Sequence, residues 1–402
     1  MKSSFKKNLF AYITLAVCAG IMIYFLISTG GVKELYSLFV NLRARWLVAA
    51  FAAAVMVWVM EAASFHAISI HVYRGWKFAY SFVSAMVGLL YSAITPFSTG
   101  GQPMQVYSLH KKGMSTGAAG AIVAVRSLVY QVALMLFSLL MVVLRLTYFT
   151  ENVSGFSALL LVGLAINIGY VLFLILVMRS PKTTDKIVFW AVRLLARLKL
   201  CKDPEARYEK IHTQLTLFHE NIKMLGKSVK MYARAILCSV FQFVFQCLIP
   251  YFLYVAFFYD TAIYHKEDIL TIMAAQAFVL MVSYFIPTPG AAGGAEISFF
   301  GFFGSFYHSI LTDANEAGRL VNASGTAFTA EEITEMSSSK LASTMFLWRF
   351  ISFYFTILAG SFFVSHLEKQ KPLKLENRLF DESALGKAPA EEAAPADTPP
   401  AE

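Results

Sequence analysis

The sequence predicts an all-α integral membrane protein with about nine membrane helices and two further segments that are re-entrant or broken. Three observations support this fold class. The chain is 57% hydrophobic, and its mean hydropathy is +0.60. Only 15% of its residues are charged, whereas a soluble domain usually has about 25%. Apolar runs of about 20 residues, the length of one membrane crossing, recur along the 402-residue chain.

The apolar runs give the expected membrane helices in order. The first follows the basic start MKSSFKKN, and no small-residue cleavage site follows it, so we interpret it as an uncleaved span rather than a signal peptide. One polytopic domain is expected over residues 1–366. Residues 367–402 end in APAEEAAPADTPPAE, which predicts a disordered cytoplasmic tail. The expected helices lie near residues 9–29, 46–69, 78–94, 115–147, 156–178, 231–259, 269–286, 295–311 and 341–365.

Basic residues set the expected orientation in a bacterial cytoplasmic membrane. Residues 179–230 form an insert rich in Lys and Arg, and such segments remain cytoplasmic. Both termini should share that side, whereas the acidic loop near 312–340 should face outside. Within the insert, IVFWAVRLLARLKL has one apolar face, so it either lies in the membrane interface or packs as an ordinary cytoplasmic helix. The net charge of +9 is then a topology signal, and no nucleic acid is expected to bind directly.

Two polar segments interrupt the apolar pattern with the same skeleton. ITPFSTGGQPMQ (residues 94–105) and IPTPGAAGGAEI (residues 286–297) each contain Thr-Pro, three residues, and Gly-Gly. Counting crossings from a cytoplasmic N-terminus places the two segments at opposite faces of the membrane. Broken elements of this kind at corresponding positions indicate an inverted repeat with a binding site between its halves. The alternative is that two Gly/Pro loops look alike by chance.

Four charged residues lie inside apolar runs. Each costs roughly 2.5–3.5 kcal/mol at the centre of a membrane helix, so each is a candidate for function. Two are acids and two are bases, which allows them to form ion pairs that only lock helices together. The sequence does not say which acid meets which base. The four residues are Glu61, Arg126, Glu296 and Arg349.

The two arginines are expected near the middle of the membrane. Arg126 lies about 16 Å along its span and Arg349 about 14 Å along its own, in a hydrocarbon layer of about 30 Å. A tyrosine is near each arginine in sequence, at Tyr130 and Tyr354. A guanidinium presents a planar fork of donors that fits a phosphate, so this pattern favours passage of a lipid headgroup.

The sequence shows no catalytic or metal-binding constellation. Its eight histidines and four cysteines have no metal-ligand spacing, so neither a metal nor a cofactor is expected. No histidine or carboxylate lies close in sequence to activate Thr95, Ser98 or Gln102 as nucleophiles. These residues are better interpreted as hydrogen-bonding groups for a headgroup or for the backbone.

Four ordered motifs resemble a known family. TPFSTGGQPMQVYSL, RSLVYQ, PTPGAAGGAE and LWRFISFYF are similar to the transmembrane, flippase-like part of the lysylphosphatidylglycerol synthetases and their stand-alone relatives. In full-length members, a soluble domain transfers lysine from lysyl-tRNA to phosphatidylglycerol, and the membrane part moves the product between leaflets. The resemblance implies display of a cationic lipid and resistance to cationic antimicrobial peptides. Only 36 residues (402 − 366) follow the last expected span, fewer than the roughly 50 of a small domain, so a stand-alone form without the transferase domain is expected.

The leading hypothesis is a lipid translocase, whose partners are a membrane phospholipid and, as a further candidate, a separate aminoacyl-lipid synthase. Two alternatives remain open: a phosphatidylglycerol lysyltransferase or its membrane subunit, and a membrane scaffold. The resemblance carries five positions to the substrate pathway, namely Gln102, Gln105, Arg126, Glu296 and Arg349. The full set of expected pathway residues is Thr95, Pro96, Gly100, Gly101, Gln102, Gln105, Arg126, Tyr130, Pro289, Gly293, Gly294, Glu296, Arg349 and Tyr354, with Glu61 as a candidate ion-pair partner.

Overall fold

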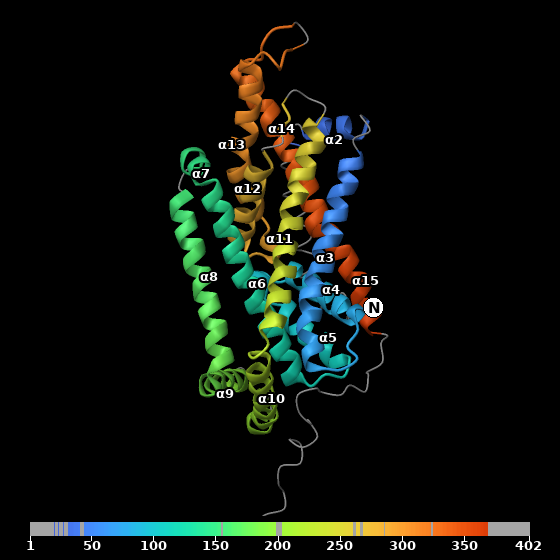
Figure 1. The fold of residues 1–402 in the computed structure, drawn as a ribbon, viewed down its shortest axis with the longest axis vertical. Helices are drawn as coiled ribbons and strands as arrows, with labels where there is room; N and C mark the ends of the chain where they lie inside the picture. Colours follow the sequence, from blue (N-terminus) through green and yellow to red (C-terminus); the bar gives the residue numbers. More distant parts are fainter. Residues whose placement is uncertain are drawn as a thin grey trace, which may run out of the picture.

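The computed structural model describes most of the chain and is almost entirely helical there (Figure 1). The first expected crossing, 9–29, and the tail beyond Glu368 fall outside the described residues, apart from isolated helical positions in the former. The all-α fold class predicted from the composition is confirmed for the part that is described. The described residues are 20, 23, 27, 31–40, 44–153, 156–197, 203–259, 263–265, 268–284, 286–322 and 325–368.

Five helices in the described part are long and apolar enough to cross a membrane. The last of them is continuous through a π-helical turn at Phe350–Tyr354, which joins α14 to α15. A short helix, α2 (Gly31–Val40), precedes the first of the five, and α7 (Leu146–Asn152) follows α6. The five are α3 (Ala44–Val72), α6 (Thr116–Leu144), α8 (Phe156–Arg179), α11 (Val229–Phe258) and the pair α14 (Ala330–Arg349) and α15 (Phe355–Glu368).

Three intervals counted from the sequence as crossings form arms of two helical hairpins. The first hairpin consists of α4 (Phe78–Ile94) and α5 (Gly101–Lys111), and the second of α12 (Asp268–Ser283) and α13 (Gly294–Glu316). With 11 residues, α5 is roughly 16 Å long, about half of a 30 Å hydrocarbon layer. Figure 1 shows the first hairpin in the lower half of the bundle and the second in the upper half. The five long helices and these three arms account for eight of the nine predicted intervals, and the remaining one, 9–29, lies almost wholly outside the described residues.

The two Thr-Pro/Gly-Gly segments form the tips of these hairpins and share a backbone conformation. Two residues after Thr-Pro adopt the left-handed region in each tip. In the first tip they are Phe97 and Ser98, with φ of 51° and 55°. In the second they are Gly290 and Ala291, with φ of 61° and 54°. Three of these four residues carry a Cβ, which costs roughly 1–2 kcal/mol in this region, so the shared conformation is not a default of the chain.

The tips of the two hairpins are in contact with each other. The 3₁₀ turn Pro96–Ser98 contacts the 3₁₀ turn Pro289–Ala291. A Cβ added to Gly290 would lie 3.1 Å from the Ala93 carbonyl oxygen and would collide with the Phe353 ring. Glycine is therefore required where the second tip touches both the first hairpin and the π-helical turn.

The order of elements repeats in opposite directions. α3, the first hairpin and α6 occupy the same order as α11, the second hairpin and the α14–α15 span, and the hairpins enter from opposite ends of the bundle (Figure 1). The two leading helices, α3 and α11, pack extensively against each other. This arrangement agrees with the inverted repeat expected from the two motifs.

Two helices, α9 (Pro181–Arg197) and α10 (Pro204–Leu225), form what we call the basic end of the bundle, where α8 ends and α11 begins. Figure 1 shows α9 lying across the direction of the long helices. Its apolar side chains remain uncovered, with Trp190 65% exposed and Ile187 41% exposed. Of the two alternatives for this stretch, an exposed apolar face favours the membrane interface.

Candidate functional site

A cavity of about 390 Å³ lies beside the tip of the first hairpin. The first hairpin, α3, α6, α8 and α11 all contribute to its walls. Its lining brings together six residues that the sequence singled out: Glu61, Gly101, Gln102, Gln105, Arg126 and Tyr130. A cavity that contains a buried arginine within a membrane bundle is a candidate functional site.

Arg126 pairs with Glu61 and still keeps an unused donor. Its Nη2 atom forms an ion pair with Oε2 of Glu61 on α3, and the two side chains are 11% and 2% exposed. Its guanidinium carbon lies 4.6 Å from the centroid of the Tyr130 ring. Among the described residues, the Arg126 Nε atom finds no hydrogen-bond acceptor. The arginine is thus neutralised by one carboxylate but is not saturated with hydrogen bonds.

The second arm of the first hairpin places amides at the cavity. The Gln102 Nε2 atom donates to Ser127 Oγ at 3.2 Å and to Tyr170 Oη at 2.9 Å, which links the hairpin to α6 and α8. Gln105 is 5% exposed and occupies space that a Cβ at Gly88 would fill. Glycine at position 88 lets α4 and α5 approach closely. The Gln102 and Gln105 side chains both line the cavity.

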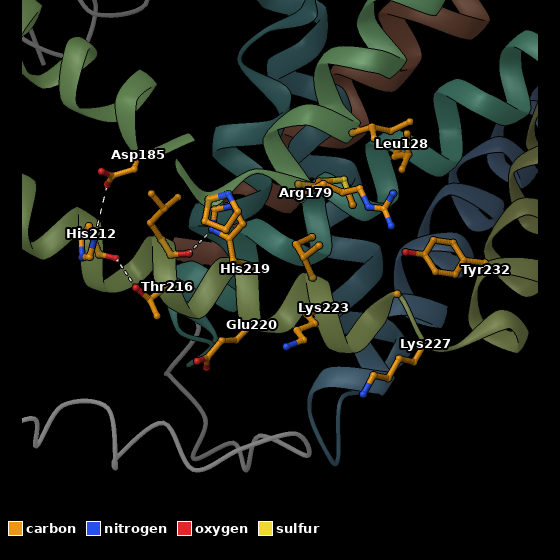
Figure 2. A pocket seen from close by; sticks show the side chains of 16 residues that line it. Leu128, Arg179, Asp185, His212, Thr216, His219, Glu220, Lys223, Lys227 and Tyr232 are labelled. Atoms are coloured by element: carbon orange, nitrogen blue, oxygen red, sulfur yellow. Dashed lines mark hydrogen bonds and ion pairs between the residues drawn. The ribbon is translucent and has the colours of Figure 1, made fainter. Parts of the chain in front are cut away.

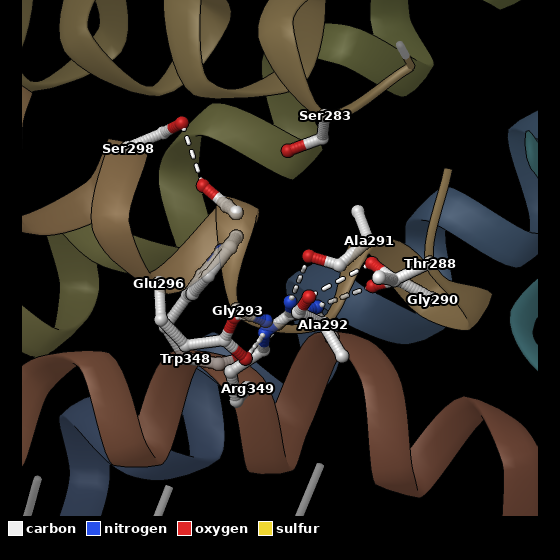
Figure 3. Close-up of polar contacts among 12 residues, drawn as sticks. Ser283, Thr288, Gly290, Ala291, Ala292, Gly293, Glu296, Ser298, Trp348 and Arg349 are labelled. Carbon is white, nitrogen blue, oxygen red and sulfur yellow. Dashed lines mark hydrogen bonds and ion pairs between the residues drawn. The ribbon is translucent and has the colours of Figure 1, made fainter. Parts of the chain in front are cut away.

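Arg349 lies in a different environment, at the tip of the second hairpin (Figure 3). Its Nε atom donates to Glu296 Oε1 at 2.7 Å. Its Nη1 and Nη2 atoms donate to the backbone carbonyls of Gly290 and Ala291 at 3.2 and 3.4 Å. The other carboxylate oxygen of Glu296 accepts the Gly293 N–H at 2.8 Å. All three guanidinium nitrogens are committed to the protein, so this arginine fastens the second tip.

Arg349 and Glu296 are not among the residues that line the cavity. The sequence suggested one pathway that contains both arginines. In the structure Arg126 lines the cavity, and Arg349 is bonded to the second hairpin tip. In both places an acid pairs with an arginine, Glu61 with Arg126 and Glu296 with Arg349. Tyr354 also lies away from the cavity lining, with its ring 5.1 Å from that of Phe353.

The remaining predicted residues shape the tips. Thr95 Oγ1 accepts the Gly100 N–H at 2.8 Å and donates to the Tyr91 carbonyl at 2.6 Å. Pro96 and Pro289 begin the two 3₁₀ turns. A Cβ at Gly294 would collide with Ile286, and Gly293 has a φ of 82°. These residues build the turn conformations and do not themselves line the cavity.

Sequence reasoning missed several polar residues of the cavity region. Tyr170 and Tyr284 line the cavity, and the Gln131 side chain donates to the amide oxygen of buried Asn167. Gln242 is 3% exposed, and its Oε1 atom has no donor partner within the described ranges. The amide side chains among them lie inside apolar spans. Because polar groups in membrane helices are costly, this position could have marked them as candidates from the sequence.

Known proteins were compared with this chain. A family model described as the lysylphosphatidylglycerol synthase TM region matches residues 11–310. A curated UPF0104 membrane protein from Archaeoglobus fulgidus is 26% identical over 343 residues, which cover 83% of this chain and 90% of that protein. No solved structure matches. The family match spans both hairpin tips and the whole lining of the cavity.

Proposed function

Because the chain belongs to the family of the lysylphosphatidylglycerol synthase TM region, we propose that it is a lipid translocase, which moves a phospholipid headgroup between leaflets through the cavity beside Arg126. One observation carries this proposal. A buried arginine with an unused Nε donor lines a cavity whose wall is a re-entrant tip. Arginine binds phosphate through two parallel hydrogen bonds, and a half-satisfied guanidinium can accept a second anion.

Glu61 is the anion that holds Arg126 when no headgroup is bound. A buried guanidinium without a counterion is costly, so the ion pair stabilises the empty cavity. An arriving phosphate would take the unused Nε donor and share or displace Glu61, while the Gln105 amide offers further donors. Arg126 would therefore exchange one anionic partner for another and keep a counterion throughout.

The acyl chains would remain in the bilayer beside α8. This helix is the least covered of the long helices, with 17% of its apolar window buried. Leu161 and Leu172 on it are 68% and 60% exposed, while Tyr170 on the same helix lines the cavity. A helix with one face in lipid and one on the cavity suits a substrate with a polar head and apolar tails.

The family's description makes aminoacylated phosphatidylglycerol a candidate substrate, in a bacterial cytoplasmic membrane with both chain termini on the cytoplasmic side. A separate aminoacyl-lipid synthase would then be the partner that supplies the lipid. The same description favours a second candidate function, a lysyltransferase or its membrane subunit. Lipid extracts from cells that express this chain alone distinguish the two, because newly formed aminoacylated lipid would support the enzyme.

Leaflet exchange of fluorescent phosphatidylglycerol in vesicles containing the purified protein tests the translocase. Arg126→Lys keeps the charge opposite Glu61 but loses the planar fork. We expect exchange to slow by about 10- to 100-fold, the loss for a charged hydrogen bond of about 1.5–3 kcal/mol. The matched control is Arg234→Lys, which changes an exposed arginine of α11 outside the cavity. Equal rates for both variants and the wild type would reject the proposal.

A further inference from the structure

A second and larger cavity, of about 800 Å³, lies at the basic end of the bundle. Its walls come from the end of α8, from α9 and α10, from the start of α11, and from Leu128 of α6 (Figure 2). Apolar side chains, including Ile175, Met178 and Ile222, line much of it. Three cations also line it, namely Arg179, Lys223 and Lys227.

The cavity has two chemically different sides. Figure 2 shows Asp185 and His212 on one side and the cations with Tyr232 on the other. The first side is occupied by its own contacts: both Asp185 carboxylate oxygens accept from the Tyr208 hydroxyl at 2.8 Å, and His212 Nε2 lies 3.8 Å from Asp185 Oδ1. The hydrogen bond to Asp185 raises the pKa of the Tyr208 hydroxyl.

In the part of the chain that the structure describes, the three cations on the other side form no ion pair with an acidic side chain. One acid, Glu220, also lines the cavity, three residues before Lys223 on α10. All three cations are solvent-exposed and belong to the end of α8, the end of α10 and the turn that follows it. Three unpaired positive charges at the rim of an apolar cavity complement a phosphate attached to an apolar body.

The sequence places Arg126 near the middle of the membrane. With its cavity, which Tyr170 also lines, at that depth, the cations lie near the headgroup level. Arg179 ends α8 and lies nine residues beyond Tyr170, or about 14 Å along the helix axis. Half of a hydrocarbon layer of about 30 Å is a similar distance. The two cavities are separated by α6, since Arg126 faces the first and Leu128 the second. The basic-end cavity is therefore a distinct site.

We propose that the basic-end cavity binds an anionic phospholipid of the adjacent leaflet, with its phosphate on Arg179, Lys223 and Lys227 and an acyl chain against Ile175, Met178 and Leu128. The apolar walls and a volume far above that of a phosphate group favour a lipid over a soluble phosphate compound. The neighbouring α9 exposes Trp190 and Ile187 and gives the cavity an apolar border continuous with the bilayer.

Native mass spectrometry of the full-length protein in nonionic detergent tests this site by titration with dioleoyl-phosphatidylglycerol, with phosphatidylcholine, and with glycerol 1-phosphate. The variant is Arg179→Gln/Lys223→Gln/Lys227→Gln. The matched control, Lys182→Gln/Lys186→Gln/Lys230→Gln, removes the same charge from exposed lysines of the same region outside the cavity. Each basic side chain beside an anionic lipid strengthens binding about fivefold, so the triple variant should bind the first phosphatidylglycerol about 100-fold more weakly at low salt.

The expected result is a large loss of affinity for phosphatidylglycerol in the cavity variant, a loss below about threefold in the control, and weak binding of phosphatidylcholine. Thermal unfolding of the wild type provides a test that needs no variant: phosphatidylglycerol should raise the Tm, and glycerol 1-phosphate should not. Equal losses in the two triple variants would overturn the site, as nonspecific attraction would explain them. Stabilisation by glycerol 1-phosphate as strong as that by the lipid would also overturn it, in favour of a soluble ligand.

Discussion

The two hairpin tips share a left-handed pair of residues after Thr-Pro, but the arginine associated with each has different partners. Both tips place left-handed residues after Thr-Pro, at Phe97 in the first and Gly290 in the second. In the second tip, Arg349 donates all its guanidinium nitrogens to Glu296 and to the tip carbonyls. In the first, Arg126 pairs with one carboxylate and faces a cavity. The arginine of the second repeat is thus bonded to its hairpin tip, whereas the arginine of the first repeat faces a cavity.

The position of the acid explains this difference. Glu296 follows the second Gly-Gly by two residues, where it caps its own helix through the Gly293 N–H and takes Arg349 at the same time. The corresponding residue of the first tip is Pro103, which has neither a carboxylate nor an N–H. The acid for Arg126 must come from another helix, and Glu61 of α3 supplies it away from the tip. The space left beside the first tip is the cavity.

The largest expected effect is on the fastened tip. Arg349→Met would leave Glu296 buried without its counterion and the Gly290 and Ala291 carbonyls without their donor. Breaking a buried pair on one side typically costs about 3–5 kcal/mol in the free energy of unfolding. Arg126→Met should cost less, because Glu61 borders a cavity that admits water. Thermal unfolding of both variants in detergent measures the difference, and equal losses would contradict the contrast between the tips.

A smaller effect is expected at the left-handed positions. Gly290→Ala adds a Cβ that meets the Phe353 ring and the Ala93 carbonyl at a φ of 61°, so we expect a loss of about 1–3 kcal/mol in the free energy of unfolding. The reciprocal change, Phe97→Gly, relieves the backbone strain of a left-handed residue whose side chain is 56% exposed. Its effect should stay within about 1 kcal/mol. A loss for Phe97→Gly as large as that for Gly290→Ala would show that the first tip is packed as tightly as the second.

The smallest expected effect concerns the two threonines. Thr95 Oγ1 holds both the Gly100 N–H and the Tyr91 carbonyl, whereas Thr288 Oγ1 donates only to the Ala292 carbonyl at 2.8 Å. Each lost hydrogen bond costs about 0.5–1.5 kcal/mol, so Thr95→Val should lower the Tm more than Thr288→Val. The reverse order would mean that the first tip depends less on its own side chains than its geometry suggests.

Much of the fold and part of the site could be predicted from the sequence. The repeated Thr-Pro/Gly-Gly skeleton located both tips, because the turn needs those residue types, and the cost of buried charge singled out the two acids and two arginines that form ion pairs. The sequence did not show that α4 and α12 are hairpin arms, because 17 and 16 apolar residues have nearly the composition of a crossing. Nor could it pair Glu61 with Arg126, since only the association of α3 with α6 brings them together.

The most direct test of the central claim is leaflet exchange by a variant that neutralises the cavity pair without unfolding the protein. Replacing both members of a buried ion pair with apolar residues of similar volume is often nearly neutral for stability, so Glu61→Leu/Arg126→Met should retain a Tm close to that of the wild type. The account predicts that this variant exchanges fluorescent phosphatidylglycerol at least about tenfold more slowly. A folded double variant that exchanges the lipid at the wild-type rate would contradict the claim that the headgroup passes Arg126.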